Sequence, residues 1–164
     1  MEHMDIISAL IEIAQRKEDH LQEMLKLTTT QRIFIKNGDM ERLSEAIDHK
    51  QLVMEQIHEL DLAFLEHYNQ LKKKFQIQSF EEMDVNKYPN LKDLKLNIQK
   101  ILQLLRQIDG LDNENKQSLK ADLEKVKDEM KKVKKQQQSA KIVSSYQNKY
   151  VGGQGVFIDN KENK

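Results

Sequence analysis

Apolar residues recur every three or four positions along the first half of the chain, which is the spacing of an α-helix that buries one face. This spacing predicts one helix over residues 4–36 and a second over residues 40–75. Asn37-Gly38 supplies a left-handed residue to end the first helix, and Asp39 can cap the second. So short a connection makes two long helices antiparallel neighbours. The predicted seam positions are Ile7, Leu10, Ala14, Lys17, Leu21, Met24 or Leu25, Thr28, Gln31, Ile35, Leu43, Ile47, Lys50, Met54, Ile57, Leu60, Phe64, Tyr68, Leu71 and Phe75.

Residues 76–90 interrupt this pattern and predict a loop, because they hold the chain's only proline and no sustained seam. Within them, Ser79-Phe80-Glu81-Glu82 has the spacing of a capping box, which indicates a single helical turn. The loop must bring the chain back toward the helical hairpin.

A third helix is predicted over residues 91–145, where Leu91, Leu94, Ile98, Ile101, Leu105 and Ile108 keep a strict heptad repeat. The apolar seam then resumes at Leu119, 11 residues after Ile108. Such a step is a heptad plus four residues, a stutter that locally unwinds a coiled coil without ending it. Gly110 lies within the step, so a break or kink there is the competing interpretation.

These elements predict an all-α fold, an elongated antiparallel helical bundle or coiled coil of three long helices with a flexible C-terminal tail. Residues 1–146 form a single helical domain in this prediction, and residues 147–164 form the tail. One-third of the 164 residues are charged and 38% are hydrophobic, which suits narrow helix seams better than a thick globular core.

The zero net charge conceals an asymmetry between the two halves of the chain. Residues 1–70 hold 7 basic and 14 acidic side chains (net −7), and residues 71–164 hold 20 and 13 (net +7). The halves should attract each other if they pack side by side, and this reading needs no external partner.

Few residues offer catalytic or metal-binding chemistry. The chain has no cysteine, and its five histidines include no i, i+4 pair, while those in the second helix lie nine residues apart and so point in alternate directions. Motifs for zinc proteases, serine hydrolases and nucleotide binding are absent. We therefore expect no enzyme activity, no catalytic residues, no metal and no cofactor.

No stretch of the sequence predicts membrane insertion, and the acidic residues near the N-terminus do not suit a secretory signal. A cytoplasmic location fits these features and the absence of cysteine. Lysine runs at 72–74 and 131–135 could contact phosphates, but acidic residues lie among the second set and no aromatic residue is interleaved for base stacking. We expect no nucleic-acid partner; a nucleic-acid-associated protein would instead show steeply salt-dependent retention of DNA or RNA.

The C-terminal part of the third helix and the tail are the predicted partner-binding region. A third helix that extends beyond the end of the helical hairpin would leave part of its apolar seam exposed. An exposed helical seam is a typical binding surface for another helix. The tail also gathers apolar and aromatic residues, which usually indicates folding on a partner or docking back on the body. The candidate partner-binding residues are Leu119, Leu123, Val126, Met130, Val133, Ile142, Val143, Tyr146, Tyr150, Val156, Phe157 and Ile158.

The chain has a long first helix, a turn with Gly-Asp, the L-x6-K-x2-V spacing in the second helix, a later Asp-Asn-Glu-Asn-Lys stretch and a Tyr…Gly…Phe-Ile-Asp-x-Lys ending. The residues in these motifs are Leu43, Lys50, Val53, Asp112 to Lys116, Tyr150, Gly152, Gly153, Phe157, Ile158, Asp159 and Lys161. This layout, and its ending above all, resembles the FlgN-type flagellar export chaperones.

This resemblance implies a cytoplasmic chaperone that binds hook-associated (hook–filament junction) proteins, prevents premature assembly and delivers them to the flagellar type III export apparatus. It places substrate contact over roughly Leu119 to Ile158, and makes Tyr146 and Tyr150 candidates for meeting the export gate. The alternative from a different class is a coiled-coil scaffold or adaptor that self-associates through its C-terminal helix. A scaffold needs a concentration-stable oligomer, whereas a chaperone allows a monomer or a weak dimer.

Overall fold

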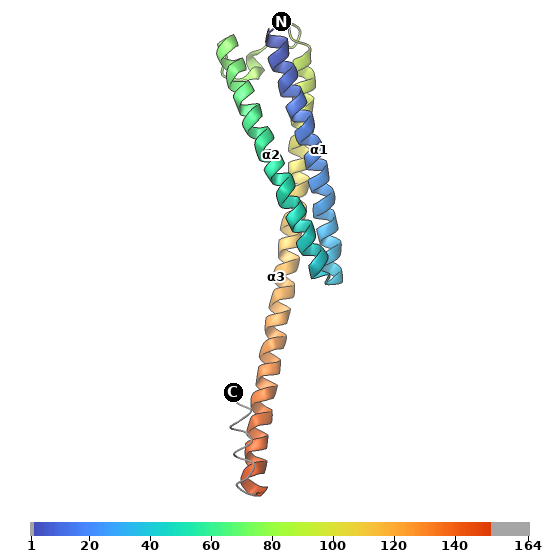
Figure 1. Ribbon diagram of the computed structural model, residues 1–164, viewed down its shortest axis with the longest axis vertical. Coiled ribbons are helices and arrows are strands. Elements are labelled where there is room, and N and C mark those ends of the chain that lie inside the picture. The colour runs from blue at the N-terminus through green and yellow to red at the C-terminus, as the bar shows by residue number, and fades with distance from the viewer. Residues whose placement is uncertain (1, 152–164) are drawn as a thin grey trace. The chain divides into compact units, whose positions relative to one another are not determined.

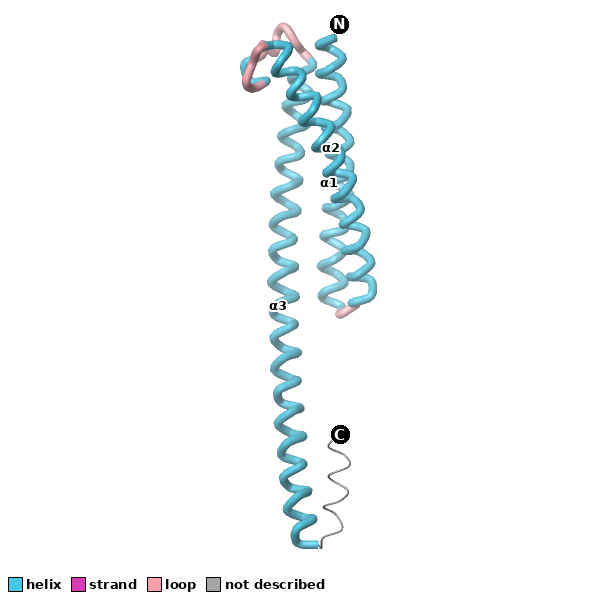
Figure 2. The backbone as a smooth tube through the Cα atoms, turned by 60° about the vertical axis from the view of Figure 1, so that its left-hand side comes forward, coloured by secondary structure: helices cyan, strands magenta, loops and turns pink. Residues whose placement is uncertain are grey.

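The computed structural model describes the backbone of residues 2–151 and the side chains of residues 6–148. It contains the helices α1 (Glu2–Asn37), α2 (Met40–Phe75) and α3 (Asn90–Val151), with a short 3-10 helix, η1 (Phe80–Glu82), between α2 and α3. No β-strand occurs in this part of the chain, as Figure 2 shows. The prediction of an all-α protein of three long helices is confirmed.

The connections between the helices use the capping residues that the sequence suggested. Gly38 adopts a left-handed φ of 67°, and the side chain of Asp39 accepts a hydrogen bond from the backbone N–H of Arg42. Gln76 ends α2, also with a left-handed φ, of 53°. Ser79 caps η1 by accepting from the backbone N–H of Glu81, so the helical turn predicted within the loop is confirmed.

The chain divides into two compact units, Met1–Gln117 and Ser118–Lys164. In the first, here called the bundle unit, α1, α2 and the first part of α3 lie side by side (Figures 1 and 2). Their inward faces form one core, to which the η1 loop adds Met83. The buried apolar residues of this core are Ile7, Leu10, Ala14, Leu21, Met24, Val53, Leu71, Met83, Leu91, Leu94, Ile101 and Ile108.

The face that α2 buries differs by one residue from the predicted seam at two positions. Ala46 and Val53 are buried, whereas the predicted Ile47 and Met54 are exposed. Small side chains at a helix contact allow the helices to approach closely, since the bulk there sets the interaxial distance. The larger residues therefore face outward, and this detail of the seam prediction was wrong.

Helix α3 continues through Gly110, so the prediction of one long helix is confirmed and the competing break does not occur. A Cβ atom added at Gly110 would meet nothing within 4 Å, and the glycine therefore serves no close contact. The helix also continues to Val151, beyond the predicted end at residue 145. No glycine or proline lies between residues 146 and 151 to stop it earlier.

A cluster of polar side chains, here called the polar layer, continues the heptad of α3 inside the bundle unit. Asn115 follows Leu94, Ile101 and Ile108 at seven-residue intervals, and Asp112 follows Leu91, Ile98 and Leu105 in the same way. Asn115 is buried and donates to the backbone carbonyl of Thr28 at 3.1 Å. The bundle seam therefore extends through polar residues to Asn115, and the phase shift expected after Ile108 lies nearer Leu119.

The centre of the polar layer is the ammonium group of Lys50. Its side chain is only 10% exposed and forms an ion pair with Asp112, whose side chain is 32% exposed. The same Nζ donates to Oε1 of Gln31 at 3.2 Å. Gln31 and Lys50 were both expected in the helix seams. The structure shows that Lys50 donates a hydrogen bond to Gln31 and forms its ion pair with Asp112 of α3.

The ion pairs that join α3 to the hairpin run opposite to the overall charge asymmetry. In Lys50–Asp112 and Arg32–Glu114 the base belongs to the acidic first half of the chain, and the acid belongs to the basic second half. Attraction between the two halves as a whole does not describe these contacts. Individual ion pairs between residues that lie opposite each other on neighbouring helices position α3 instead.

Candidate partner-binding surface

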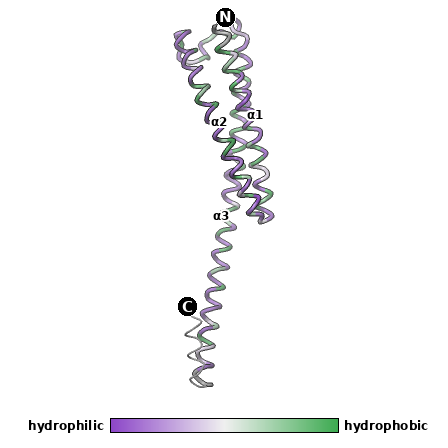
Figure 3. The backbone as a smooth tube through the Cα atoms, viewed as in Figure 1, coloured by the Kyte–Doolittle hydropathy of each residue, from purple (hydrophilic) through white to green (hydrophobic). Residues whose placement is uncertain are grey.

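Five of the predicted partner-binding residues form one apolar stripe on the part of α3 that follows Gln117. This seam stripe consists of Leu119, Leu123, Val126, Met130 and Val133. Leu119 is half-buried, and the other four are exposed, with Leu123 at 54% and Met130 at 66%. Figure 3 shows this stretch of α3 as mainly hydrophilic, with short hydrophobic patches between. Apolar side chains spaced in this way are open to a partner helix.

The stripe is narrow because its residues follow the alternating four- and three-residue steps of a coiled coil. At 3.6 residues per turn, its members fall within an arc of roughly 80° around the helix axis. Such an arc is the width of a coiled-coil seam, narrower than the face of a helix packed on a globular core. The geometry therefore suits one partner helix lying along α3.

A second group of predicted residues, Ile142, Val143 and Tyr146, lies on a different side of α3. These residues form what we call the opposite face; all three are exposed, with Tyr146 at 62%. Counted along the same helix from Leu119, their directions centre roughly 180° away from the seam stripe. One straight partner helix therefore cannot cover both sets. The sequence analysis named both sets as candidate partner-binding residues, and α3 places them on different sides of the helix.

The remaining predicted residues are only partly described by the structure. The backbone of Tyr150 belongs to α3, while its side chain lies outside the described residues. Val156, Phe157 and Ile158 also lie outside the described residues. Their role in partner binding stays a prediction.

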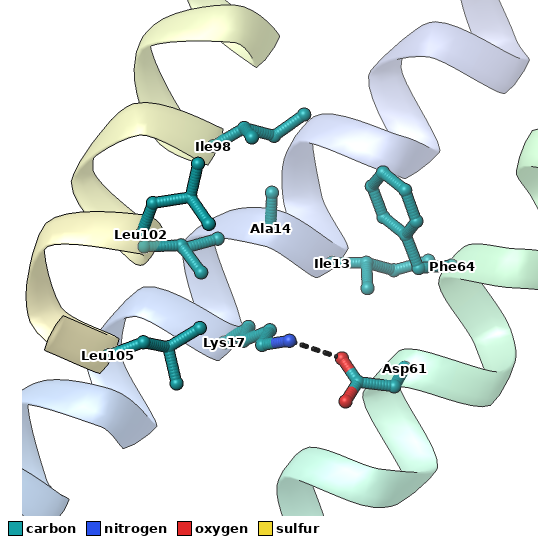
Figure 4. A pocket seen from close by; sticks show the side chains of 9 residues that line it. Ile13, Ala14, Lys17, Asp61, Phe64, Ile98, Leu102 and Leu105 are labelled. Atoms are coloured by element: carbon teal, nitrogen blue, oxygen red, sulfur yellow. Dashed lines mark hydrogen bonds and ion pairs between the residues drawn. The ribbon is translucent and has the colours of Figure 1, made fainter. Parts of the chain in front are cut away.

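The bundle unit carries an apolar groove that the sequence did not indicate (Figure 4). It has a volume of about 250 Å³, and all three long helices contribute to its wall. Lys17 of α1 forms an ion pair with Asp61 of α2 at 2.6 Å beside the apolar side chains. Lys17 interrupted the predicted seam of the first helix, and this pair is how it is accommodated. The lining residues are Ile13, Ala14, Lys17, Asp61, Phe64, Ile98, Ile101, Leu102 and Leu105.

The sequence analysis did not predict two features of the bundle unit, the polar layer and the apolar groove, although the sequence contains a signal for the polar layer. Extending the heptad count beyond Ile108 leads directly to Asp112 and Asn115, so the polar layer could have been found. The groove had no such signal, because it depends on how far apart the helices stand. Lys50 and Asp112, which belong to separate parts of the FlgN resemblance, meet in the polar layer and act there in packing.

The described residues show no arrangement for metal-dependent chemistry. Among them, no three His, Cys, Asp or Glu side chains lie close enough together to hold a metal ion. Two of the histidines make contacts within the bundle unit: Nε2 of His49 lies 3.0 Å from a carboxylate oxygen of Glu23, and Nδ1 of His67 lies 2.8 Å from the backbone carbonyl oxygen of Ala63. Within the same part of the chain, no helix is long and apolar enough to cross a membrane.

These features define the class of protein: a helical bundle that buries one apolar seam and leaves a second one exposed. Comparison with known proteins then shows the family. The sequence matches the FlgN protein family over residues 1–149, and the chain belongs to that family. A search of curated proteins and a search of solved structures each gave no match. FlgN proteins are flagellar export chaperones that bind flagellar proteins, and they are not a family of enzymes.

Proposed function

We propose that this protein is a cytoplasmic flagellar type III export chaperone for hook-associated (hook–filament junction) proteins. It binds them before export, prevents their premature assembly and delivers them to the export apparatus. The observation that carries the proposal is the exposed seam stripe on α3 in a chain of the FlgN family. Junction proteins polymerise through terminal coiled-coil segments, and a helix with an open seam can cover such a segment.

The strength of this contact follows from the side chains in the stripe. Fully burying a Val, Leu or Met side chain contributes roughly 1.5–3 kcal/mol, and these residues are already about half covered by their own helix. Each therefore adds about 1 kcal/mol on binding, before the cost of ordering the partner is subtracted. The resulting affinity is moderate, which suits a protein that must release its cargo.

The opposite face provides a separate surface for the second step of delivery. Tyr146 is exposed there, and Tyr150 follows one helical turn later in the sequence. We assign these tyrosines to the contact with the export gate, and the seam stripe together with Val156, Phe157 and Ile158 to the cargo. Because the two faces point in opposite directions, cargo on the seam stripe leaves the tyrosines accessible.

The proposal is tested by co-purifying the full-length chain with the hook-associated proteins of the same cell. The variant Leu123→Asp/Met130→Asp places two charges in the seam stripe and is expected to lower capture by at least tenfold, since buried charges without partners are strongly disfavoured. Leu52→Asp is the matched control, because Leu52 is a comparably exposed apolar residue on α2 (60%). Its capture should equal that of the unmodified protein.

Two results would contradict the proposal. One is the absence of capture by the full-length chain with every junction protein of that cell. The other is equal loss of capture in the α3 variant and the α2 control, which would show that surface charge in general, and not the seam stripe, matters. Circular dichroism of each variant checks that its helix content is unchanged.

A further inference from the structure

The sequence that forms the last turns of α3 and continues beyond it carries positive charge without any acid. Residues 131–158 contain six lysines and no aspartate, glutamate or arginine, so this stretch has a net charge of +6. No other acid-free stretch of the chain is as long, and the chain as a whole has no net charge. The six residues are Lys131, Lys132, Lys134, Lys135, Lys141 and Lys149.

Three of these lysines lie on the same side of α3 as the opposite face. At 3.6 residues per turn, Lys131, Lys132 and Lys135 all point within roughly 70° of the mean direction of the opposite face. These three residues, here called the basic patch, are exposed and precede the opposite face by about three turns. The last acids on this side, Glu124 and Asp128, come before the basic patch in the sequence. One side of α3 therefore presents exposed positive charge followed by exposed apolar side chains.

This combination matches the surface of a lipid bilayer that contains anionic lipids. Anionic headgroups attract ammonium groups, and apolar side chains of an amphipathic helix enter the boundary between headgroups and acyl chains. Ile142 and Val143, which are 58% and 55% exposed, would lose contact with water there. Tyr146 joins an apolar ring to a hydroxyl group, a combination that suits the same boundary.

Other anionic partners fit this side of α3 less well. Nucleic acid would use the lysines, but no aromatic residue lies among them to stack on bases, and phosphates offer nothing to Ile142 and Val143. An acidic protein would need an apolar patch of its own at the same distance from its charges. Every anionic bilayer supplies both the charge and the apolar layer.

We propose that the last turns of α3 bind the surface of an anionic lipid bilayer through the basic patch and the opposite face. The contact is peripheral, because the helix lies along the bilayer and does not cross it. The seam stripe then points away from the lipid, since it lies roughly 180° around the helix from the opposite face. Tyr146 is also assigned to the export gate, so the lipid and the gate would use this face in turn. The lipid contact itself does not rest on the proposed function, because it follows from the side chains of this chain alone.

The first test is flotation of the full-length protein with phosphatidylcholine vesicles that contain about 30% phosphatidylserine, at about 0.1 M salt. The protein should float with these vesicles and should stay unbound with vesicles of phosphatidylcholine alone. Raising the salt to about 0.5 M should release it, because screening weakens the attraction between exposed charges.

A pair of charge variants tests whether one side of the helix makes the contact. K132E/K135E should lower the vesicle partition coefficient by at least about 25-fold, since each lysine at an anionic surface strengthens binding about fivefold. K134E/K141E is the matched control, because it makes the same change of charge on the side of the seam stripe. It should lower the partition coefficient by less than about fivefold, since about 10 Å of helix diameter and a Debye length of similar size separate these charges from the lipid.

The second test follows the opposite face directly and uses the absence of tryptophan from the chain. Tyr146→Trp should shift its fluorescence emission to shorter wavelength when the phosphatidylserine vesicles are added, because the ring leaves water. Met130→Trp is the matched control, since Met130 on the seam stripe is 66% exposed and Tyr146 is 62% exposed. Its emission should stay that of a ring in water.

Each outcome bears on the proposal. Failure of the full-length protein to float with phosphatidylserine vesicles overturns it, as does an equal loss of binding in K132E/K135E and K134E/K141E. An RNA or DNA oligonucleotide that binds more tightly than the vesicles, with an affinity that I142S/V143S leaves unchanged, overturns it in favour of nucleic acid. Circular dichroism checks that each variant keeps its helix content. Flotation as described by a protein that captures no hook-associated protein leaves this inference standing and contradicts the chaperone function, so the two can fail separately.

Discussion

The polar layer allows a prediction in which removing one partner of an ion pair destabilises the protein more than removing both. The substitution is Asp112→Leu, which takes away the carboxylate that pairs with Lys50. The Lys50 side chain is only 10% exposed, so its ammonium group would keep little water and only the hydrogen bond to Gln31 at 3.2 Å. An unpaired charge left inside a protein is strongly destabilising.

The magnitude follows from the burial of the two partners. Breaking a fully buried ion pair costs about 3–5 kcal/mol, and here Asp112 is 32% exposed and Gln31 remains, so we expect about 2–3 kcal/mol for Asp112→Leu. Lys50→Met leaves a carboxylate that water can still reach, and should cost about 1 kcal/mol. The double variant Lys50→Met/Asp112→Leu should lie within about 1 kcal/mol of the unmodified protein, because apolar side chains replace the whole pair.

The assay is urea unfolding followed by circular dichroism, with the four proteins forming a double-mutant cycle. Arg32–Glu114 is the matched control pair, since it also joins α3 to the hairpin while its side chains are 46% and 56% exposed. Its coupling energy should be below about 1 kcal/mol and should vanish at high salt. A Lys50–Asp112 coupling below about 0.5 kcal/mol, or one as sensitive to salt as the control, would refute the reasoning.

Three further predictions concern the backbone and the packing of the helices. Gly110→Ala should raise the free energy of unfolding by up to about 1 kcal/mol in urea melts, since a Cβ meets nothing within 4 Å in this helix interior. Gly38→Ala should lower it by about 1 kcal/mol, because its φ of 67° is unfavourable for alanine. Ala46→Leu should destabilise by about 1–3 kcal/mol through overpacking at a buried position, while Ile47→Leu, on the exposed side, should change stability by less than about 0.5 kcal/mol.

The α2 seam shows where sequence reasoning reaches its limit. Ile47 and Met54 are larger apolar residues than Ala46 and Val53, and both sets fit a helical repeat beside Leu43 and Lys50. The apolar area available for burial favours the larger residues, whereas the structure buries the smaller ones. The choice depends on how closely two helices approach, and that distance is a property of the pair.

The candidate partner-binding surface also has one feature that the sequence could predict and one that required the structure. The heptad of the seam stripe predicted a surface for another helix, and the exposure of Leu123 and Met130 agrees with it. The separation of Tyr146 from this stripe needed the knowledge that α3 runs without a break to Val151. A kink of unknown angle anywhere between them would have changed which residues share a face.

The sequence by itself determined the three helices, their turn and loop, the heptad of α3 and the membership of the FlgN family, because each depends on local spacing or on matching residue types. The tertiary structure alone decided which residues of α2 face inward, that Lys50 meets Asp112, and where the apolar groove opens. These features join residues from different helices. Their energies depend on the distance and rotation between the helices, which no periodicity within one segment can specify.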